Sequence, residues 1–232
     1  MRIVRTVFVS AGAALVAVAA FAAIPKDEAK RLNQAAAVVS EIRNAENGVP
    51  EDVWNKADCV VVIPGLKKAG FIIGGEFGSG VMSCRNDGAW GAPVFMSLTK
   101  GSAGLQIGAE SIDLVLLVMN HKGAEKLLSN NVTLGADASI AAGPVGRTGS
   151  AGTDAKLSAE MLSYSRSKGL FAGIDLSGGV LKPDRSANAK AYGPNPAPKD
   201  IALGTAPVSL SAEARTFTEA LGRGVRATSG VK

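Results

Sequence analysis

The residues of this sequence with the most obvious chemistry are cations that lie in or beside glycine-containing turns. They are Lys67 and Lys68 before GFIIGG, Arg147 within AAGPVGRTGSAGTD, and Arg166 and Lys168 within SYSRSKG. If these three turns meet at one end of a folded sheet, their cations and free backbone amides would form an anion-binding site. Each residue taken singly is also consistent with an ordinary solvated turn position.

The glycine-rich segment 141–154 fits none of the usual nucleotide-binding patterns. No stretch of the chain has the Walker spacing of glycines followed by Lys and Ser or Thr. The dinucleotide fingerprint also fails, because Ser83 stands where a third glycine would have to follow Gly78 and Gly80. Its local pattern predicts a flexible connection, in which glycines supply positive φ and Pro144 fixes φ.

The sequence contains few residues in patterns that are typical of catalytic sites. The chain has a single histidine, His121, near an expected helix start, and no serine has glycine two residues before and after it. Histidine, cysteine and carboxylates form no close set of metal ligands. Spacing selects no pair for glycosidase-type chemistry among the candidate carboxylates, which are Glu76, Glu110, Asp113, Asp137, Asp154, Glu160 and Asp175. We therefore expect no enzyme, no cofactor and no metal site.

Two of these acids, Asp113 and Asp175, lie within apolar runs. Such acids usually face solvent from a half-buried strand. If buried, they need a cationic partner, for which Arg147 and Arg166 are the candidates.

The first 22 residues have the features of a secretory signal peptide. Arg2 and Arg5 precede an apolar run that is too short to span a membrane, and Ala20-Phe21-Ala22 forms a cleavage site. Removing this segment lowers the formal net charge from +5 to about +3, which is too small an excess to indicate nucleic-acid binding. We expect a periplasmic or secreted protein that begins near Ala23.

Export to an oxidising compartment would favour a disulfide between the two cysteines, Cys59 and Cys84. Their spacing fits no zinc or redox motif, and each borders an apolar, strand-like run. A bridge closing a loop of about 26 residues would contribute about 3.5 kcal/mol in the chain-entropy model. The alternative is a pair of unpaired, buried thiols.

The hydrophobic pattern predicts one α+β domain over residues 23–232. Helical periodicity covers Lys26–Asn47, a short helix follows in VPEDVWNKAD, and further helices are expected over His121–Ser129, Asp184–Tyr192 and about 208–226. GPNPAPKD is expected to be a proline-rich turn. Segments between these helices are rich in Val, Ile, Phe and Gly, with a hairpin turn at Asn86-Asp87-Gly88. Glycines within strands favour a strongly curved, mostly antiparallel, barrel-like sheet with the terminal helices packed against it.

Four stretches carry a resemblance to the SYLF domain family, in that family's order and over about residues 30–195. They are CVVVIPGLKKAGFIIGGEFGSGVMSCR, IGAESIDLVLLVMNHKGAEKLL, NVTLGADASIAAGPVGRTGSAG and AEMLSYSRSKGLFAGIDLSGGVLKPD. The resemblance implies a binding module, since eukaryotic SYLF proteins bind phosphoinositides and other anionic lipids, and some bind actin. His121 departs from the pattern, because relatives often have an acid at that position.

For an exported, bacterial-type member, the resemblance implies binding of anionic lipid head groups or membrane surfaces. The residues that would serve are the cations of the three turns, with Phe71 and Phe171 in contact with acyl chains; both phenylalanines are also consistent with core positions. A structural or protein-interaction module of the cell envelope is the second interpretation. An unrecognised carboxylate hydrolase is the third.

Overall fold

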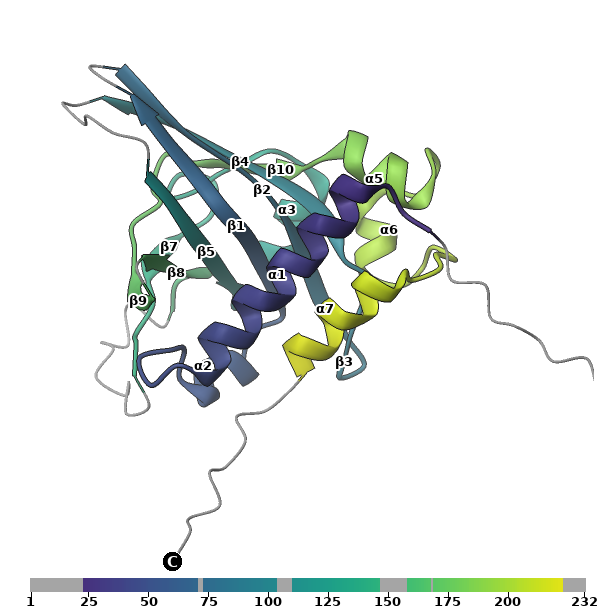
Figure 1. The fold of residues 1–232 in the computed structure, drawn as a ribbon, viewed down its shortest axis with the longest axis horizontal. Coiled ribbons are helices and arrows are strands. Elements are labelled where there is room, and N and C mark those ends of the chain that lie inside the picture. Colours follow the sequence, from purple (N-terminus) through teal and green to yellow (C-terminus); the bar gives the residue numbers. More distant parts are fainter. Residues whose placement is uncertain (1–22, 71–72, 104–109, 147–157, 168, 223–232) are drawn as a thin grey trace, which may run out of the picture.

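The chain folds into an α+β domain in which a strongly curled, mostly antiparallel sheet is covered by N-terminal and C-terminal helices (Figure 1), as the sequence predicts. The computed structural model describes residues 23–70, 73–103, 110–146, 158–167 and 169–222. The expected signal peptide, residues 147–154 of the glycine-rich segment, and the end of the expected C-terminal helix lie outside these residues.

The sheet has the strand order β6-β10-β4-β2-β1-β5-β8-β7, with β3 paired to β2 and β9 paired to β8. The strands are β1 Cys59–Gly70, β2 Ile73–Asn86, β3 Ala89–Trp90, β4 Val94–Ala103, β5 Glu110–Val118, β6 Val132–Thr133, β7 Ile140–Ala142, β8 Met161–Ser167, β9 Leu170–Gly173 and β10 Val180–Pro183. Neighbouring strands pair antiparallel, except that β7 runs parallel to β8.

The helices are α1 Lys26–Asn44, α2 Glu51–Asn55, α3 His121–Ser129, α5 Arg185–Tyr192, α6 Pro198–Ala202 and α7 Ala212–Gly222. Helix α1 ends three residues earlier than predicted because Ala45 adopts an extended backbone. The proline-rich segment predicted as a turn includes the start of α6, which begins at Pro198, a residue whose fixed φ suits the first helical position. Among the described helices, none is both long and apolar enough to cross a membrane.

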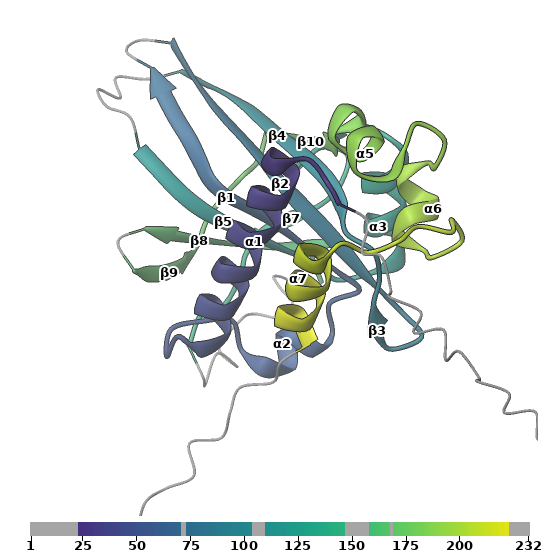
Figure 2. The same ribbon diagram turned by 45° about the vertical axis from the view of Figure 1, so that its right-hand side comes forward.

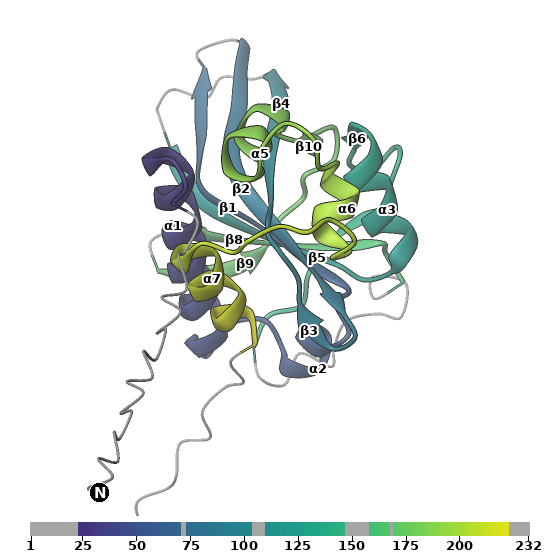
Figure 3. The same ribbon diagram turned by 90° about the vertical axis from the view of Figure 1, so that its right-hand side faces the viewer.

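Both faces of the central strands are buried, which explains the continuous apolar runs in the sequence. Along β1, Val60 and Val62 point into a hydrophobic cluster formed with α1, α2 and α7, whereas Val61 and Ile63 point into a second cluster beneath α3 and α6. Figure 3 shows α1 and α7 on one side of the sheet, with α3 and α6 on the other. The chain therefore builds two cores on a single sheet.

Two local predictions about β1 and β2 are confirmed. Cys59 and Cys84 lie directly opposite each other on these strands and form a disulfide. The hairpin from β2 to β3 turns at Asp87 and Gly88, whose φ angles of 50° and 84° suit the two central positions of a tight hairpin turn.

Beyond the helices, the sheet continues as a projecting end. Pro64 and Gly65 drop out of register with both neighbouring strands, and such a bulge bends a strand. Gly80 of β2 permits this bend, since a Cβ there would collide with the Val62 carbonyl and lie 2.7 Å from Ile63 Cγ1. Past the bulge, β1, β2 and β4 extend away from the helices (Figures 1 and 2).

Candidate functional site

A groove of about 610 Å³ lies between the first half of α1 and the sheet at the base of the projecting end. Helix α1 supplies Asp27, Lys30 and Arg31 to one wall, and the strands supply Lys67 and Phe77 to the other. A volume of this size is typical of ligand-binding clefts.

The floor of the groove is lined with hydroxyl groups because the face of the sheet toward α1 changes character as it leaves the core. On β4, Phe95 belongs to the core, whereas Ser97 and Thr99 face the groove two and four residues further along. Neighbouring strands follow the same pattern, with Ser79 on β2 and Ser111 on β5. Four hydroxyls from three strands can thus donate to, or accept from, a polar ligand.

The cations of the groove differ in their availability. Lys30 and Lys67 are exposed, and neither has an ion-pair partner among the described residues. The Lys67 ammonium lies 6.0 Å from the ring centroid of Phe77, a large apolar side chain that is 52% exposed. Arg31 is engaged by Asp184, with a distance of 3.1 Å between Nη1 and Oδ2. The groove therefore presents two free ammonium groups beside an exposed aromatic ring.

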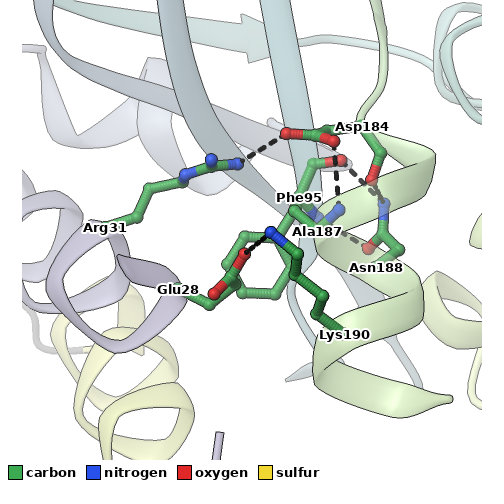
Figure 4. A network of polar contacts seen from close by, with 7 residues as sticks. All are labelled: Glu28, Arg31, Phe95, Asp184, Ala187, Asn188 and Lys190. Atoms are coloured by element: carbon green, nitrogen blue, oxygen red, sulfur yellow. Dashed lines mark hydrogen bonds and ion pairs between the residues drawn. The ribbon is translucent and has the colours of Figure 1, made fainter. Parts of the chain in front are cut away.

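A polar network holds α1 in place above the sheet (Figure 4). Arg31 pairs with Asp184, and Glu28, which is 2% exposed, lies 3.8 Å from the ammonium of Lys190 on α5. Helix α5 is in turn fixed to β4, because Asn188 exchanges two hydrogen bonds of 2.9 Å with the backbone of Phe95. These contacts position the groove-facing side of α1.

Arg166 ties four elements together instead of facing a free surface. Its guanidinium contacts Asp113 Oδ2 on β5 at 3.1 Å and also pairs with Glu41 of α1. The other Asp113 oxygen accepts a hydrogen bond from the Gly65 amide in the β1 bulge, and the Phe171 ring lies 6.0 Å from Arg166 Cζ. Asp113 is half-buried, and its ion-pair partner is Arg166, one of the two candidates named for a buried acid at this position.

The three basic turns were predicted to lie together at one end of the sheet, and the structure describes some of their residues. Lys67 and Lys68 were expected in a turn, and this is wrong: β1 continues through both, so they face opposite sides of the sheet. Lys67 shares the α1-facing side with Arg166, whereas Lys68 lies 3.6 Å from Glu76 in an ion pair. Phe171 is 5% exposed and belongs to the core. Phe71, Arg147 and Lys168 lie outside the described residues.

Reasoning from the sequence missed Lys30, Phe77 and the four hydroxyls. The available signal was the alternation of large or hydroxyl side chains with glycine or leucine in EFGSG and MSLT, which places Phe77 with Ser79, and Ser97 with Thr99, on one face of each strand. Lys30 carries no comparable signal, because only the packing of α1 brings it over the groove.

Three of the candidate carboxylates, Asp137, Glu160 and Asp175, are engaged in structural hydrogen bonds, whereas Asp154 lies outside the described residues. Burial would raise the pKa of Glu160, but the Ser139 amide and the Lys126 ammonium outweigh it and hold the pKa below its ordinary value. Hydrogen bonds from neighbouring Thr and Ser residues likewise lower the pKa of Asp137 and of Asp175. These three groups stay ionised at neutral pH, which suits structural anchors and not proton donors.

His121 is an exposed residue at the start of α3, 3.8 Å from Glu125 one turn later. Over the described part of the chain, His, Cys, Asp and Glu form no group able to hold a metal ion.

A family profile and individual relatives identify the same group of proteins as similar to this chain. The sequence profile of the Ysc84 family, described as "Las17-binding protein actin regulator", matches residues 99–223, more than half of the chain. The chain is 37% identical over 170 residues to LAS seventeen-binding protein 3 of Saccharomyces cerevisiae, covering 71% of this chain and 37% of that protein. It is 34% identical over 194 residues to SH3 domain-containing YSC84-like protein 1 of Rattus norvegicus, covering 81% and 56%. The chain thus spans about a third to just over half of these relatives.

Proposed function

Because this chain belongs to the Ysc84 (SYLF) family, whose profile describes binding and regulatory proteins, we propose that it is a non-enzymatic module that binds anionic lipid head groups at a membrane surface. The observation that carries the proposal is the convergence of Lys30, Lys67 and the exposed Phe77 on one hydroxyl-lined groove. Free ammonium groups attract phosphate oxygens, the hydroxyls complete the hydrogen bonding, and the aromatic ring contacts the apolar boundary of the bilayer.

The expected strength of this binding is modest. Each lysine near an anionic surface contributes about 1 kcal/mol at physiological ionic strength, and the contribution falls off within a Debye length of about 8 Å. Burying the remaining exposed part of Phe77 would add a fraction of the roughly 1.5–3 kcal/mol that a fully buried large side chain contributes. Such an interface binds reversibly and loses affinity as salt is raised.

We further propose that the protein acts outside the cytoplasm, in the periplasm or beyond the cell. The Cys59–Cys84 disulfide supports this compartment, since such bonds persist in oxidising surroundings. The expected leader over residues 1–22 supports it independently. N-terminal sequencing of the protein recovered from fractionated cells would check both points, and a cytoplasmic protein starting at Met1 would contradict them.

The test is flotation of the protein with neutral and with anionic vesicles at low and moderate salt. We expect binding to anionic vesicles alone, weakened by salt, and a decrease of about 30-fold or more in the Lys30→Glu, Lys67→Glu double variant, since two lysines contribute about 2 kcal/mol. Lys56→Glu is the control, because Lys56 is exposed at the C-cap of α2 and lies outside the groove. Equal loss in both variants, or no vesicle binding at all, would exclude the proposal.

A protein partner is the second candidate function, favoured by the profile description and by the relatives named for binding Las17. The same groove would then receive an acidic segment of another protein. Chemical crosslinking in cells that carry the wild-type chain or the double lysine variant would distinguish the two. A partner lost in the variant, together with indifference to lipid, would favour the protein-interaction function.

A further inference from the structure

A second cavity, of about 470 Å³, lies away from the groove, where α3, α5 and the segment between α5 and α6 come together. Figure 3 shows α3, α5 and α6 close to one another. Its size lies within the range of small-molecule sites, and neither the proposed lipid binding nor the family description involves it.

The lining of this cavity has an unusual charge balance. Arg185 and Lys199 both border it, whereas none of the described residues that line it is an aspartate or a glutamate. Lys199 is held by Glu125 at 2.9 Å, but Arg185 is exposed and has no ion-pair partner in the described part of the chain. The nearest acid in the sequence, Asp184, is already committed to Arg31 and to the amide of Ala187. One guanidinium is therefore available to a ligand.

Four uncharged polar side chains of the cavity are free as well. Asn130 and Asn131 follow the end of α3, Asn195 lies in the proline-rich segment, and Ser129 ends α3. The side chains of these four residues make no hydrogen bond within the described structure. Amides both donate and accept, so the set matches a ligand that carries several hydroxyl groups.

The walls of the cavity are rigid, which reduces the entropy lost when a ligand binds. Four prolines contribute to the lining: Pro183, Pro194, Pro196 and Pro198. Asn188 fixes α5 to β4 through its two hydrogen bonds to Phe95 and a third to the Asp184 carbonyl (Figure 4). The Lys199–Glu125 pair fixes α6 to α3.

We propose that this cavity binds a small polyhydroxylated anion, that is, a phosphate or carboxylate carried on a sugar-like scaffold. The anionic group pairs with the Arg185 guanidinium, whose fork of N–H donors suits two oxygens at once. The hydroxyl groups of the scaffold bond to the three asparagine amides and to Ser129. The absence of carboxylates from the described lining removes the repulsion that such a ligand would otherwise meet.

The test titrates the isotope-labelled full chain with glucose 6-phosphate, glucuronate, glucose and inorganic phosphate, observed by amide NMR. We expect one or both sugar anions to bind, with shifts confined to residues 128–131 and 183–199. Glucose and phosphate alone should bind at least about tenfold more weakly, since each makes only part of the contacts. The better of the two sugar anions identifies the preferred acid group.

Arg185→Gln should weaken that binding about tenfold, and Lys56→Gln, which removes one equally exposed charge elsewhere, should leave it unchanged. The Lys30→Glu, Lys67→Glu variant should also leave it unchanged, so this site and the groove fail or hold independently. The proposal is overturned if no probe binds up to about 10 mM, a limit near the weakest specific sites. It is equally overturned by shifts spread over all basic surfaces, or by equal losses in Arg185→Gln and Lys56→Gln.

Discussion

Replacing Gly143 with alanine is expected to destabilise the domain, because this glycine lies against the ring of the fully buried Tyr164. An added Cβ would lie 2.5 Å from Tyr164 Cε1 and closer still to Cζ and the hydroxyl oxygen. Carbon atoms in favourable contact are separated by about 3.5–4.0 Å, so the ring would have to withdraw by about 1 Å or more. Tyr164 belongs to the core beneath α1, where there is no free space to receive it.

The expected loss in the free energy of unfolding is about 3 kcal/mol, the upper end of the range for overpacked cores, because a planar ring cannot bend away from the new methyl group. For a domain of this size it corresponds to a fall of about 6–12 °C in Tm. Urea and thermal unfolding followed by circular dichroism would measure both quantities. Gly101→Ala is the matched control, since nothing lies within 4 Å of a Cβ at that strand position, and it should change stability by less than about 0.5 kcal/mol.

A double-mutant cycle separates this contact from a general effect on the backbone. If the collision with the ring is the cause, Gly143→Ala should cost less than about 1 kcal/mol in a Tyr164→Leu background, where the planar ring is gone. Two results would refute the reasoning. One is a Gly143→Ala protein that melts within about 1 °C of the wild type. The other is a loss that stays undiminished in the Tyr164→Leu background.

Three further predictions concern other stabilising contacts. Reducing the Cys59–Cys84 disulfide should lower the free energy of unfolding by about 3.5 kcal/mol, measurable by urea unfolding with and without reductant, and an unchanged midpoint would contradict it. Because the folded pKa of Glu160 lies below its ordinary value of 4.5, its stabilising effect is complete above that pH and is lost as pH falls through the folded pKa. Glu160→Gln should therefore lose about 1 kcal/mol at pH 7, and its difference from the wild type should disappear as pH falls through the folded pKa of Glu160; a pH-independent difference would argue against this linkage. Arg166→Met should lose about 1–3 kcal/mol by leaving Asp113 without a cation, and adding Asp113→Asn should recover part of it; strict additivity would exclude the pairing.

Signals that are local in the sequence predicted much of the fold. The change from a helical to an extended hydrophobic pattern at Cys59 located the start of the sheet, and Asp87-Gly88 located the hairpin between β2 and β3. Helix α3 has the bounds predicted for it, with Asn120 accepting a hydrogen bond from the Gly123 amide as its N-cap. In each case the information lies within a few neighbouring residues.

The candidate site was harder to predict because it depends on register between strands far apart in the sequence. Lys67 and Lys68 were expected in a turn before GFIIGG, whereas pairing with β2 and β5 absorbs Pro64 and Gly65 as a bulge and continues the strand through both lysines. Whether a lysine then faces the groove or the opposite side is decided by a shift of one residue. No property of Lys67 or Lys68 alone distinguishes the two outcomes.

A basic residue can bind an anionic ligand readily only if its charge is not already paired with a carboxylate. By this criterion, the basic residue of the family motif differs from the lysines of the groove. In SYSRSKGLFAG, which lies within one of the four stretches that carry the resemblance, Tyr164 and Phe171 are core residues and Arg166 is neutralised by two carboxylates. A head group that recruited Arg166 would have to break both ion pairs and leave Asp113 half buried without a cation. Lys30 and Lys67 face no such competition. Tyr164, Arg166 and Phe171 therefore stabilise the fold, and under the proposed function ligand preference would depend on the groove residues while the fold is retained.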